Sequence, residues 1–357
     1  MLPRGFFMKL KLKLSILVIA VMVFVVLGIS VMLLKQSSGY TIGLNIDALD
    51  YAGNWRAADL QGRENSRIQA LRTIENVMSD YENIPAQQRR DQFENIMQAV
   101  LAHNPGFFII YTVWKPNAVD GMDSYFSGRT GSSPTGQFAL EVTRENGRIE
   151  KRTVNDLEGS MEYLTGPDSN KEMVSSPEAR TIGARNTYII NFMVPIVNPR
   201  TNETVGAVGG YIDIDGIQTA VEDTMNNYDI ISLMAIYDNS GFILANTEAD
   251  RVGKNMRDVE TLYGYYLEDA VRAVARGYAG RYNSYSLVLD TNVQIQLTSF
   301  QIGNSDKTWT VMIAATEDYM LLEVRLMTHF TIILAVLAIA AAAVIIYFAL
   351  GKLLSQS

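Results

Sequence analysis

The chain carries the sequence NPGFFIIYTVWKPNAVDGMD at residues 104–123, and this stretch sets the arrangement of the segments around it. Asn104-Pro105-Gly106 ends a helix, because Pro and Gly both disfavour helical continuation. Phe107–Val113 is rich in β-branched and aromatic residues, a pattern that predicts a strand. Lys115–Thr135 is rich in Pro, Gly, Ser and Asp and predicts a long loop, and such loops inside compact domains are often functional.

The segments before residue 104 predict helices. Apolar residues recur every three or four positions from Glu64 to Asn83, which is the period of an amphipathic helix. Ile42–Leu60 carries more scattered apolar residues and is expected to extend this helix toward the N-terminus. Pro85 suits the first position of a second helix, whose apolar face continues through Phe93–Leu101.

The segments after residue 135 alternate between strands and helices. A strand, a polar turn, a strand and an acidic residue that opens a helix occur at Tyr188–Ile214 and again at Gln296–Asp318. This weak internal repeat predicts an α+β fold with two antiparallel-sheet modules on one helical stalk. The predicted strands are Gln137–Arg144, Tyr188–Val197, Val205–Ile214, Leu233–Tyr237, Phe242–Ala245, Gly280–Leu289, Val293–Gln301 and Thr308–Ala314, and the helices are Gly216–Tyr228, Tyr266–Arg276 and Glu317–Met327.

Two uncharged apolar segments, Leu14–Leu34 and Phe330–Leu350, flank everything else. Each is long enough to cross a bilayer as a helix, since about 20 residues span its hydrocarbon core. Basic residues gather before the first segment, which places residues 1–13 and 351–357 in the cytoplasm and 36–329 outside. A cleaved signal peptide is the alternative, but the apolar run reaches Lys35 without a small-residue cleavage site. We therefore expect a two-pass protein of the inner (cytoplasmic) membrane with a periplasmic or extracellular insert.

The charge and cysteine content of the insert, residues 36–329, exclude some classes of partner and of chemistry. It holds all 38 acidic residues and 24 of the 30 basic ones, a net charge of −14. Nucleic acid and anionic membrane surfaces both require basic patches, so neither is an expected partner of the insert. The sequence has no cysteine, which excludes disulfides, thiolate catalysis and cysteine metal sites.

The sequence also gives little support for catalysis, a cofactor or a metal. His103 lies at a predicted helix end, where a favourable interaction with the last carbonyls explains it, and His329 adjoins the second span. Residues 128–136 and 206–210 are glycine-rich but match no phosphate-binding motif. Residues 120–123 read DGMD, which lacks the spacing of a calcium loop and favours a turn. We expect no enzyme, no cofactor and no metal site.

The layout resembles the double Cache (dCache) sensor region of bacterial methyl-accepting chemotaxis proteins, over roughly Leu14 to Leu350. Asn104-Pro105-Gly106, the strand after it and the run from Trp114 to Asp123 are the most specific part of this resemblance. Further similar stretches are Val194-Pro195-Ile196, Val205–Gly209, Gly241–Ala245 and Lys307–Val311. The resemblance implies PAS-like modules at about 85–228 (membrane-distal) and 229–316 (membrane-proximal), between transmembrane helices at 14–34 and 330–350.

By this resemblance the protein is a homodimeric chemoreceptor that binds a small ligand in the distal module and transmits a helix shift across the membrane. The implied ligand-binding residues are Tyr111, Trp114, Asp120, Asp123, Tyr125, Tyr163, Tyr188, Asn191, Tyr211 and Asp213. Each aromatic among them has an alternative reading as ordinary core. The other functional readings are the sensor portion of a histidine kinase or cyclase, a membrane-anchored extracytoplasmic enzyme, and an adhesion or assembly module.

Two departures from the family pattern change what is expected of the ligand class and of the signalling output. Amino-acid sensors of the family place an Asp where this chain has Tyr211, and their Arg-x-Trp-Tyr clamp is missing around Tyr163. A buried amino acid needs its charges paired, so the ligand is expected not to be a standard amino acid. The family continues into a cytoplasmic signalling module, whereas this sequence ends at Ser357, so the output is expected from a module outside it.

Overall fold

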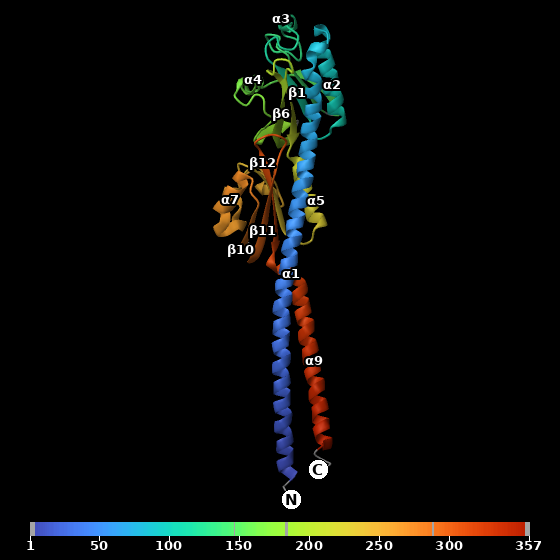
Figure 1. Ribbon diagram of the computed structural model, residues 1–357, viewed down its shortest axis with the longest axis vertical. Coiled ribbons are helices and arrows are strands. Elements are labelled where there is room, and N and C mark those ends of the chain that lie inside the picture. Colours follow the sequence, from blue (N-terminus) through green and yellow to red (C-terminus); the bar gives the residue numbers. More distant parts are fainter. Residues whose placement is uncertain (1–3, 146, 183–184, 288, 354–357) are drawn as a thin grey trace. The chain divides into compact units, whose positions relative to one another are not determined.

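The computed structural model describes residues 4–145, 147–182, 185–287 and 289–353 (Figure 1). The chain divides into two compact units. One unit comprises the residues up to Ala48 together with those from Ala315 onward, and the other is Leu49–Ala314. Where it is described, the first unit is helical except for Leu321 and for Ala315 and Thr316, which end strand β12 (Thr308–Thr316). The second unit contains both sheets.

The first unit contains both predicted spans. They lie in α1 (Arg4–Ser79) and in α9 (Leu322–Leu353), and both helices are long and apolar enough to cross a membrane. Between β12 and α9 lies the short α8 (Glu317–Met320), whose Met320 carbonyl accepts a 2.9 Å hydrogen bond from the Asn45 side chain. The uninterrupted helix predicted over Glu317–Met327 is wrong at Leu321, where φ −96° and ψ 3° leave helical geometry.

The distal sheet is antiparallel in the strand order β3-β2-β1-β7-β6-β4, with β5 also paired to β6 (Figure 1). Its central strand β1 is the one predicted after the Asn-Pro-Gly stop. Side chains alternate between the two faces, so odd-numbered and even-numbered residues of β1 enter different environments. The strands are β1 (Ile109–Trp114), β2 (Ala139–Glu145), β3 (Arg148–Thr153), β4 (Met173–Val174), β5 (Glu178–Ile182), β6 (Arg185–Val197) and β7 (Thr204–Asp213).

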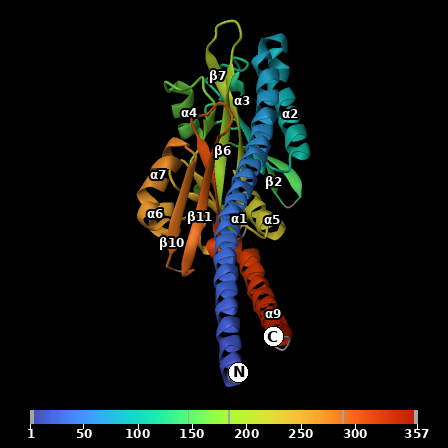
Figure 2. The ribbon, with the colours of Figure 1, turned by 60° about the horizontal axis from the view of Figure 1, so that its bottom comes forward.

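One face of this sheet packs on helices. The C-terminal part of α1, the single turns η1 (Tyr81–Asn83) and η2 (Ala86–Gln88), and α2 (Arg89–His103) run alongside it (Figures 1 and 2). Trp114 stacks on Phe93 at 5.6 Å and meets Tyr81 edge-on at 5.2 Å between ring centroids. The even-numbered side of β1 is therefore an aromatic core. The other face lies toward α4 (Leu157–Thr165), and the short α3 (Asp123–Phe126) lies in the long loop after β1.

The proximal sheet is also antiparallel, in the order β10-β11-β12-β8-β9. Helix α5 (Asp215–Asn227) leads into it from β7, and α7 (Leu267–Arg276) packs its apolar side into the core of this module. Its elements are β8 (Leu233–Asp238), β9 (Ile243–Asn246), η3 (Ala249–Arg251), α6 (Met256–Val259), η4 (Thr261–Tyr266), β10 (Gly280–Ser286), β11 (Thr291–Gln301) and β12 (Thr308–Thr316).

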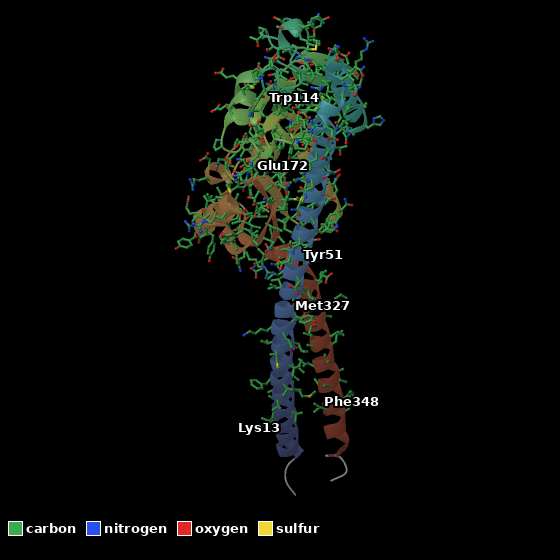
Figure 3. All side chains as sticks on the ribbon, turned by 45° about the horizontal axis from the view of Figure 1, so that its top comes forward. Lys13, Tyr51, Trp114, Glu172, Met327 and Phe348 are labelled. Atoms are coloured by element: carbon green, nitrogen blue, oxygen red, sulfur yellow. The ribbon has the colours of Figure 1, made fainter. Side chains whose placement is uncertain are left out.

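The carboxylate of Glu172 ties the stalk helix to both sheet modules (Figure 3). It accepts hydrogen bonds from Arg72 Nε at 2.6 Å on α1 and from the backbone N–H of Asn304 at 2.7 Å, in the turn between β11 and β12. The predicted fold class, a long N-terminal helix with two antiparallel sheets, is confirmed. The module boundaries near residues 85, 228 and 316 stay predictions.

Candidate functional site

The face of the distal sheet turned toward α4 carries an unusual set of polar and aromatic side chains. Strand register places Glu141 of β2, Tyr111 of β1 and Gly209 of β7 side by side, and Asn191 of β6 beside Tyr211. Apolar residues of the same face, including Ile109, pack around them and against α4. A row of neighbouring strands thus supplies a carboxylate, an amide and two phenols to one surface.

Tyr111 is the centre of this cluster. Its side chain is 1% exposed, and its hydroxyl lies 2.8 Å from Nδ2 of Asn191. The Tyr211 ring lies 5.4 Å away at a tilt of 31°, within the range of aromatic contact. Burial raises the pKa of the Tyr111 hydroxyl well above its usual value, so the group is a neutral hydrogen-bonding partner.

Gly209 explains how Tyr111 reaches this position. A Cβ on Gly209 would lie 2.4 Å from the Tyr111 ring, far inside van der Waals contact. The ring therefore lies directly on the backbone of β7, which only a glycine at this strand position permits.

Two charged side chains complete the cluster. Glu141 is 5% exposed, and burial raises its carboxyl pKa although Arg180 and Arg152 act to lower it. The Arg180 guanidinium, from β5, lies 5.4 Å from the centre of the Tyr211 ring, a cation–π distance. The cluster therefore offers both a carboxyl group and a cation beside aromatic surfaces.

Helix α4 closes over the cluster. Asp156 caps its N-terminus by accepting a 3.0 Å hydrogen bond from the Gly159 N–H. Tyr163 on the same helix packs against the apolar residues of this face, and its hydroxyl donates to the carbonyl of Lys171. Burial raises the pKa of Tyr163. Among the sequence-predicted site residues, the structure brings together Tyr111, Tyr163, Asn191 and Tyr211.

Trp114 lies elsewhere. It is fully buried on the helix-facing side of the sheet, and its Nε1 donates to the Thr112 hydroxyl at 3.1 Å (Figure 3). The reason is strand periodicity, since Trp114 and Tyr111 are three positions apart and point to opposite faces. Its role in the structure is that of a core residue.

Asp120, Asp123 and Tyr125, the three predicted site residues in the long loop, make structural contacts within and around that loop. Arg90 on α2 pairs with Asp120 (Nε to Oδ2, 2.7 Å) and with Asp123 (Nη2 to Oδ1, 2.7 Å), and both carboxylates are buried. Arg90 further donates to Ser132 and to the Gly136 carbonyl, so it ties both ends of the loop to α2. Tyr125 is 60% exposed and packs against Phe126 and Arg129.

The last two predicted site residues lie on β6 and β7. Tyr188 points away from the α4 side and contacts the proximal module, with its ring 5.0 Å from that of Phe242. Asp213 shares the face of Tyr211, two positions further along β7, and is partly buried.

Sequence reasoning missed Glu141, Arg180 and Arg90. Glu141 did carry a signal, because it is a single carboxylate inside the otherwise apolar run Phe138–Val142 of a predicted strand. Arg180 and Arg90 lie in polar stretches in which the sequence marks no arginine as special.

Solved structures with a similar fold indicate the class of domain to which this fold belongs. The periplasmic sensory domain of the Campylobacter jejuni chemoreceptor Tlp1 superposes with a TM-score of 0.60 at 18% identity, covering 77% of this chain and 96% of that one. The extracellular domain mmHK1S-Z2, assigned to a histidine kinase, superposes with a TM-score of 0.62 at 19% identity, covering 78% of this chain and 99% of that one. The chain thus has the fold of extracytoplasmic sensor domains, and the resemblance to double Cache sensor regions is confirmed at the level of the fold.

A particular relative follows from sequence. The methyl-accepting chemotaxis protein TlpQ of Pseudomonas aeruginosa is 23% identical over 268 residues, which cover 65% of this chain. The chain spans about a third of the length of that curated relative (36%). No protein-family model matches the chain. These similarities support a sensor role.

Proposed function

We propose that this protein is a transmembrane sensor that binds a small extracellular ligand between α4 and the distal sheet. The observation that carries the proposal is the cluster of Tyr111, Asn191, Tyr211, Glu141 and Arg180, which converge on one sheet face beneath a helix. Ligand sites are typically lined by apolar and aromatic side chains with a few placed polar groups, and the side chains of this face have that composition. The fold it belongs to is that of sensor domains.

The chemistry of the cluster favours a small organic amine. Tyrosine rings attract a cation through their faces. Burial raises the pKa of the Glu141 carboxyl, and an ammonium bound beside it would favour its ionised form and pair with it. Asp156 and Glu178 add negative charge near Tyr211, and Arg180 adds positive charge there. A standard amino acid would need a dedicated carboxylate clamp as well, and Arg180 is already placed over the Tyr211 ring.

The proposed signal passes through the helices. The insert lies outside the cell, and both spans cross the inner membrane in a homodimer, as the charge distribution and the family resemblance imply. A ligand that prefers one of two arrangements of α9 would shift it, and helix movements of ~1–2 Å are an established route for such signals. The output is chemotactic by the relationship to TlpQ, with a kinase or cyclase output as the alternative.

The test is ligand binding to the full chain in nanodiscs. Choline, ethanolamine and putrescine are compared with acetate and succinate by thermal shift and calorimetry, and the recovered ligand is analysed for turnover. We expect an amine to bind and to be recovered without chemical conversion. Glu141→Gln should weaken the affinity for the amine about tenfold or more, because one charge pair is lost. Tyr111→Phe should weaken binding less, and Glu158→Gln, an exposed carboxylate on α4, is the matched control.

Several outcomes would overturn the proposal. If Glu141→Gln and Tyr111→Phe each bind the amine as tightly as wild type does, the site lies elsewhere. Chemical conversion of the amine would favour the membrane-anchored enzyme. Absence of any ligand response would favour an adhesion or assembly module.

A further inference from the structure

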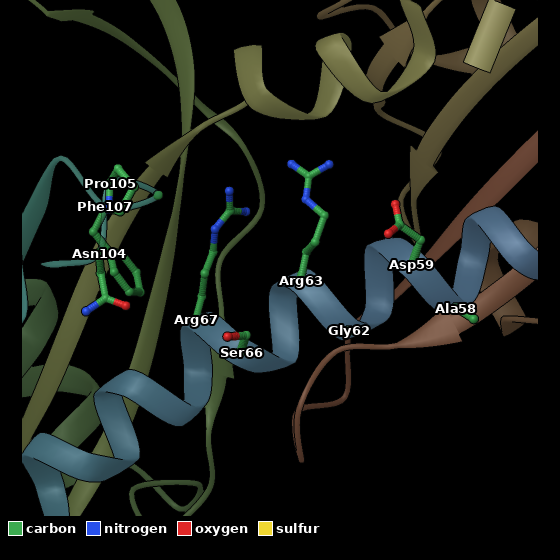
Figure 4. Close-up of a pocket in the computed structure, with 10 residues that line it drawn as sticks. Ala58, Asp59, Gly62, Arg63, Ser66, Arg67, Asn104, Pro105 and Phe107 are labelled. Carbon is green, nitrogen blue, oxygen red and sulfur yellow. The ribbon is translucent and has the colours of Figure 1, made fainter. Parts of the chain in front are cut away.

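A groove lies along the stalk helix, away from the α4 side of the distal sheet. Figure 4 shows Arg63 and Arg67, one helical turn apart on α1, pointing in the same direction into a groove. The groove has a volume of about 530 Å³ and is bounded by α1 and the turn Asn104–Phe107 that leads into β1. Its lining also includes Ser66 and Asp59.

The two guanidinium groups converge. A Cβ on Gly216, at the start of α5, would lie 3.9 Å from Nη2 of Arg63 and 3.9 Å from Nη2 of Arg67. The two terminal nitrogens therefore lie within about 8 Å of each other. Like charges at this spacing repel, and an anion between them would relieve the repulsion.

The nearby acids leave an excess of positive charge. Glu64 is fully buried and accepts from Arg67 Nη1 with both oxygens, at 2.6 and 2.5 Å, so it compensates Arg67. Asp59 contacts Arg56 at 3.4 Å. Arg63 donates from Nη2 to the Gly216 carbonyl at 3.0 Å, a neutral acceptor. Glu64 attracts Arg63 as well as Arg67, so the two arginines share one carboxylate. With Asp59 paired to Arg56, one positive charge remains in excess in the groove, although the insert as a whole is strongly acidic.

Hydrogen-bond donors remain to hold an anion. A guanidinium has five N–H groups. Among the described residues, the hydrogen bonds of these two side chains engage only Nη2 of Arg63 and Nη1 of Arg67. The approach of Gly106 fixes Arg67 from the other side, since a Cβ there would lie 2.8 Å from Nε. The fork of an arginine matches the oxygens of phosphate and carboxylate.

We propose that this groove, the stalk groove, binds a small oxyanion that carries a phosphate or carboxylate group. Arg63 and Arg67 bind it directly, and Ser66 and Asn104 lie at its rim. An anion held there contacts α1, the turn before β1 and the start of α5 together. Occupancy therefore stabilises the docking of the stalk helix on the distal sheet, independently of the ligand proposed for the α4 side.

The test uses the full chain in nanodiscs of zwitterionic lipid. Inorganic phosphate replaces chloride at constant ionic strength, and succinate is used in the same way as the carboxylate probe. Binding is measured by thermal shift and by calorimetry. We expect saturable stabilisation by at least one of the two anions and about tenfold weaker binding in Arg63→Gln, because a charge-assisted pair is lost. Ser66→Asp, an exposed substitution that places a negative charge in the groove, should weaken binding similarly.

Arg148→Gln, an exposed arginine of β3, is the matched control and should bind like wild type. Arg67→Gln is avoided, because it would leave the buried Glu64 without its partner. The proposal is overturned if neither anion acts beyond the chloride effect, or if Arg63→Gln and Ser66→Asp both bind as tightly as wild type. Loss of the amine response in the same variants would instead point to misfolding, so that response is measured in parallel.

Discussion

Gly209 shows how one residue determines the shape of the candidate ligand site. It pairs with Tyr111 across β1 and β7, and its missing side chain lets the tyrosine ring rest on the strand backbone. The neighbouring Gly210 does the same on the opposite face, where a Cβ would lie 2.6 Å from the ring of Phe107. Two adjacent glycines therefore set the packing of aromatic rings on both faces of the distal sheet.

We expect Gly209→Ala to be destabilising by ~1–3 kcal/mol, as for other overpacked positions, and to weaken amine binding. The reason is that the new Cβ would meet Cζ of Tyr111 at 2.4 Å and displace the ring from its contact with Asn191. Thermal unfolding of the full chain and ligand titration measure both effects. Gly62→Ala on α1 is the control, because its Cβ meets open space, and it should be neutral or gain about 0.5–1 kcal/mol. Equal stability of the two variants would contradict this account.

The contrast between Tyr111 and Trp114 marks the limit of sequence reasoning about the site. Both residues lie in the one predicted strand, and alternation says that they face opposite ways. It does not say which face is covered by α1 and α2 and which by α4, because that depends on contacts between segments far apart in sequence. The same limit hid Arg180, which reaches Tyr211 from β5.

At the scale of elements, the long loop after β1 is held by one side chain. Arg90 is 6% exposed and binds Asp120, Asp123, Ser132 and the Gly136 carbonyl, and its guanidinium lies 4.1 Å from the ring of Phe126. The loop was predicted to carry ligand-binding carboxylates. Their buried pairing with α2 is a sufficient structural explanation for both of them.

We expect Arg90→Ala to be destabilising by ~3–5 kcal/mol, because it leaves two buried carboxylates without their partner. Limited proteolysis should then cut within residues 115–136, and urea unfolding should report the loss of stability. Arg148→Ala, at an exposed position of β3, is the control. A variant that keeps wild-type stability and protease resistance would show that the loop is anchored by other contacts.

Elements with strong periodicity were predicted well and polar elements were not. The stalk helix, β1, β6 and β7 follow apolar patterns that burial in a core requires. The edge strand β3 reads RIEKRT and is mostly exposed, so it carries little hydrophobic signal. The segment from β3 to β5, which includes α4, was therefore left without assigned structure, although α4 covers the candidate site.

At the scale of the whole molecule, the folded insert holds several carboxyl groups whose burial raises their pKa. They lie in different places: Glu64 and Glu75 on the stalk helix, Glu141 in the distal sheet and Glu260 in the proximal module. In each case burial is the largest cause, and for three of the four it outweighs nearby arginines. These groups hold their protons more tightly when the insert is folded than when it is unfolded.

The sign of the pH dependence follows from proton binding. Above the ordinary value of 4.5, and up to the raised folded pKa, the folded state binds more protons than the unfolded state. These four groups therefore make stability fall as the pH rises through that window. We expect the insert to have a higher Tm at about pH 5 than at about pH 7.5, measured in nanodiscs at constant ionic strength. Glu141→Gln should flatten part of this slope, whereas Glu158→Gln should not. A Tm that rises toward neutral pH would show that burial of these carboxyl groups does not govern the pH response.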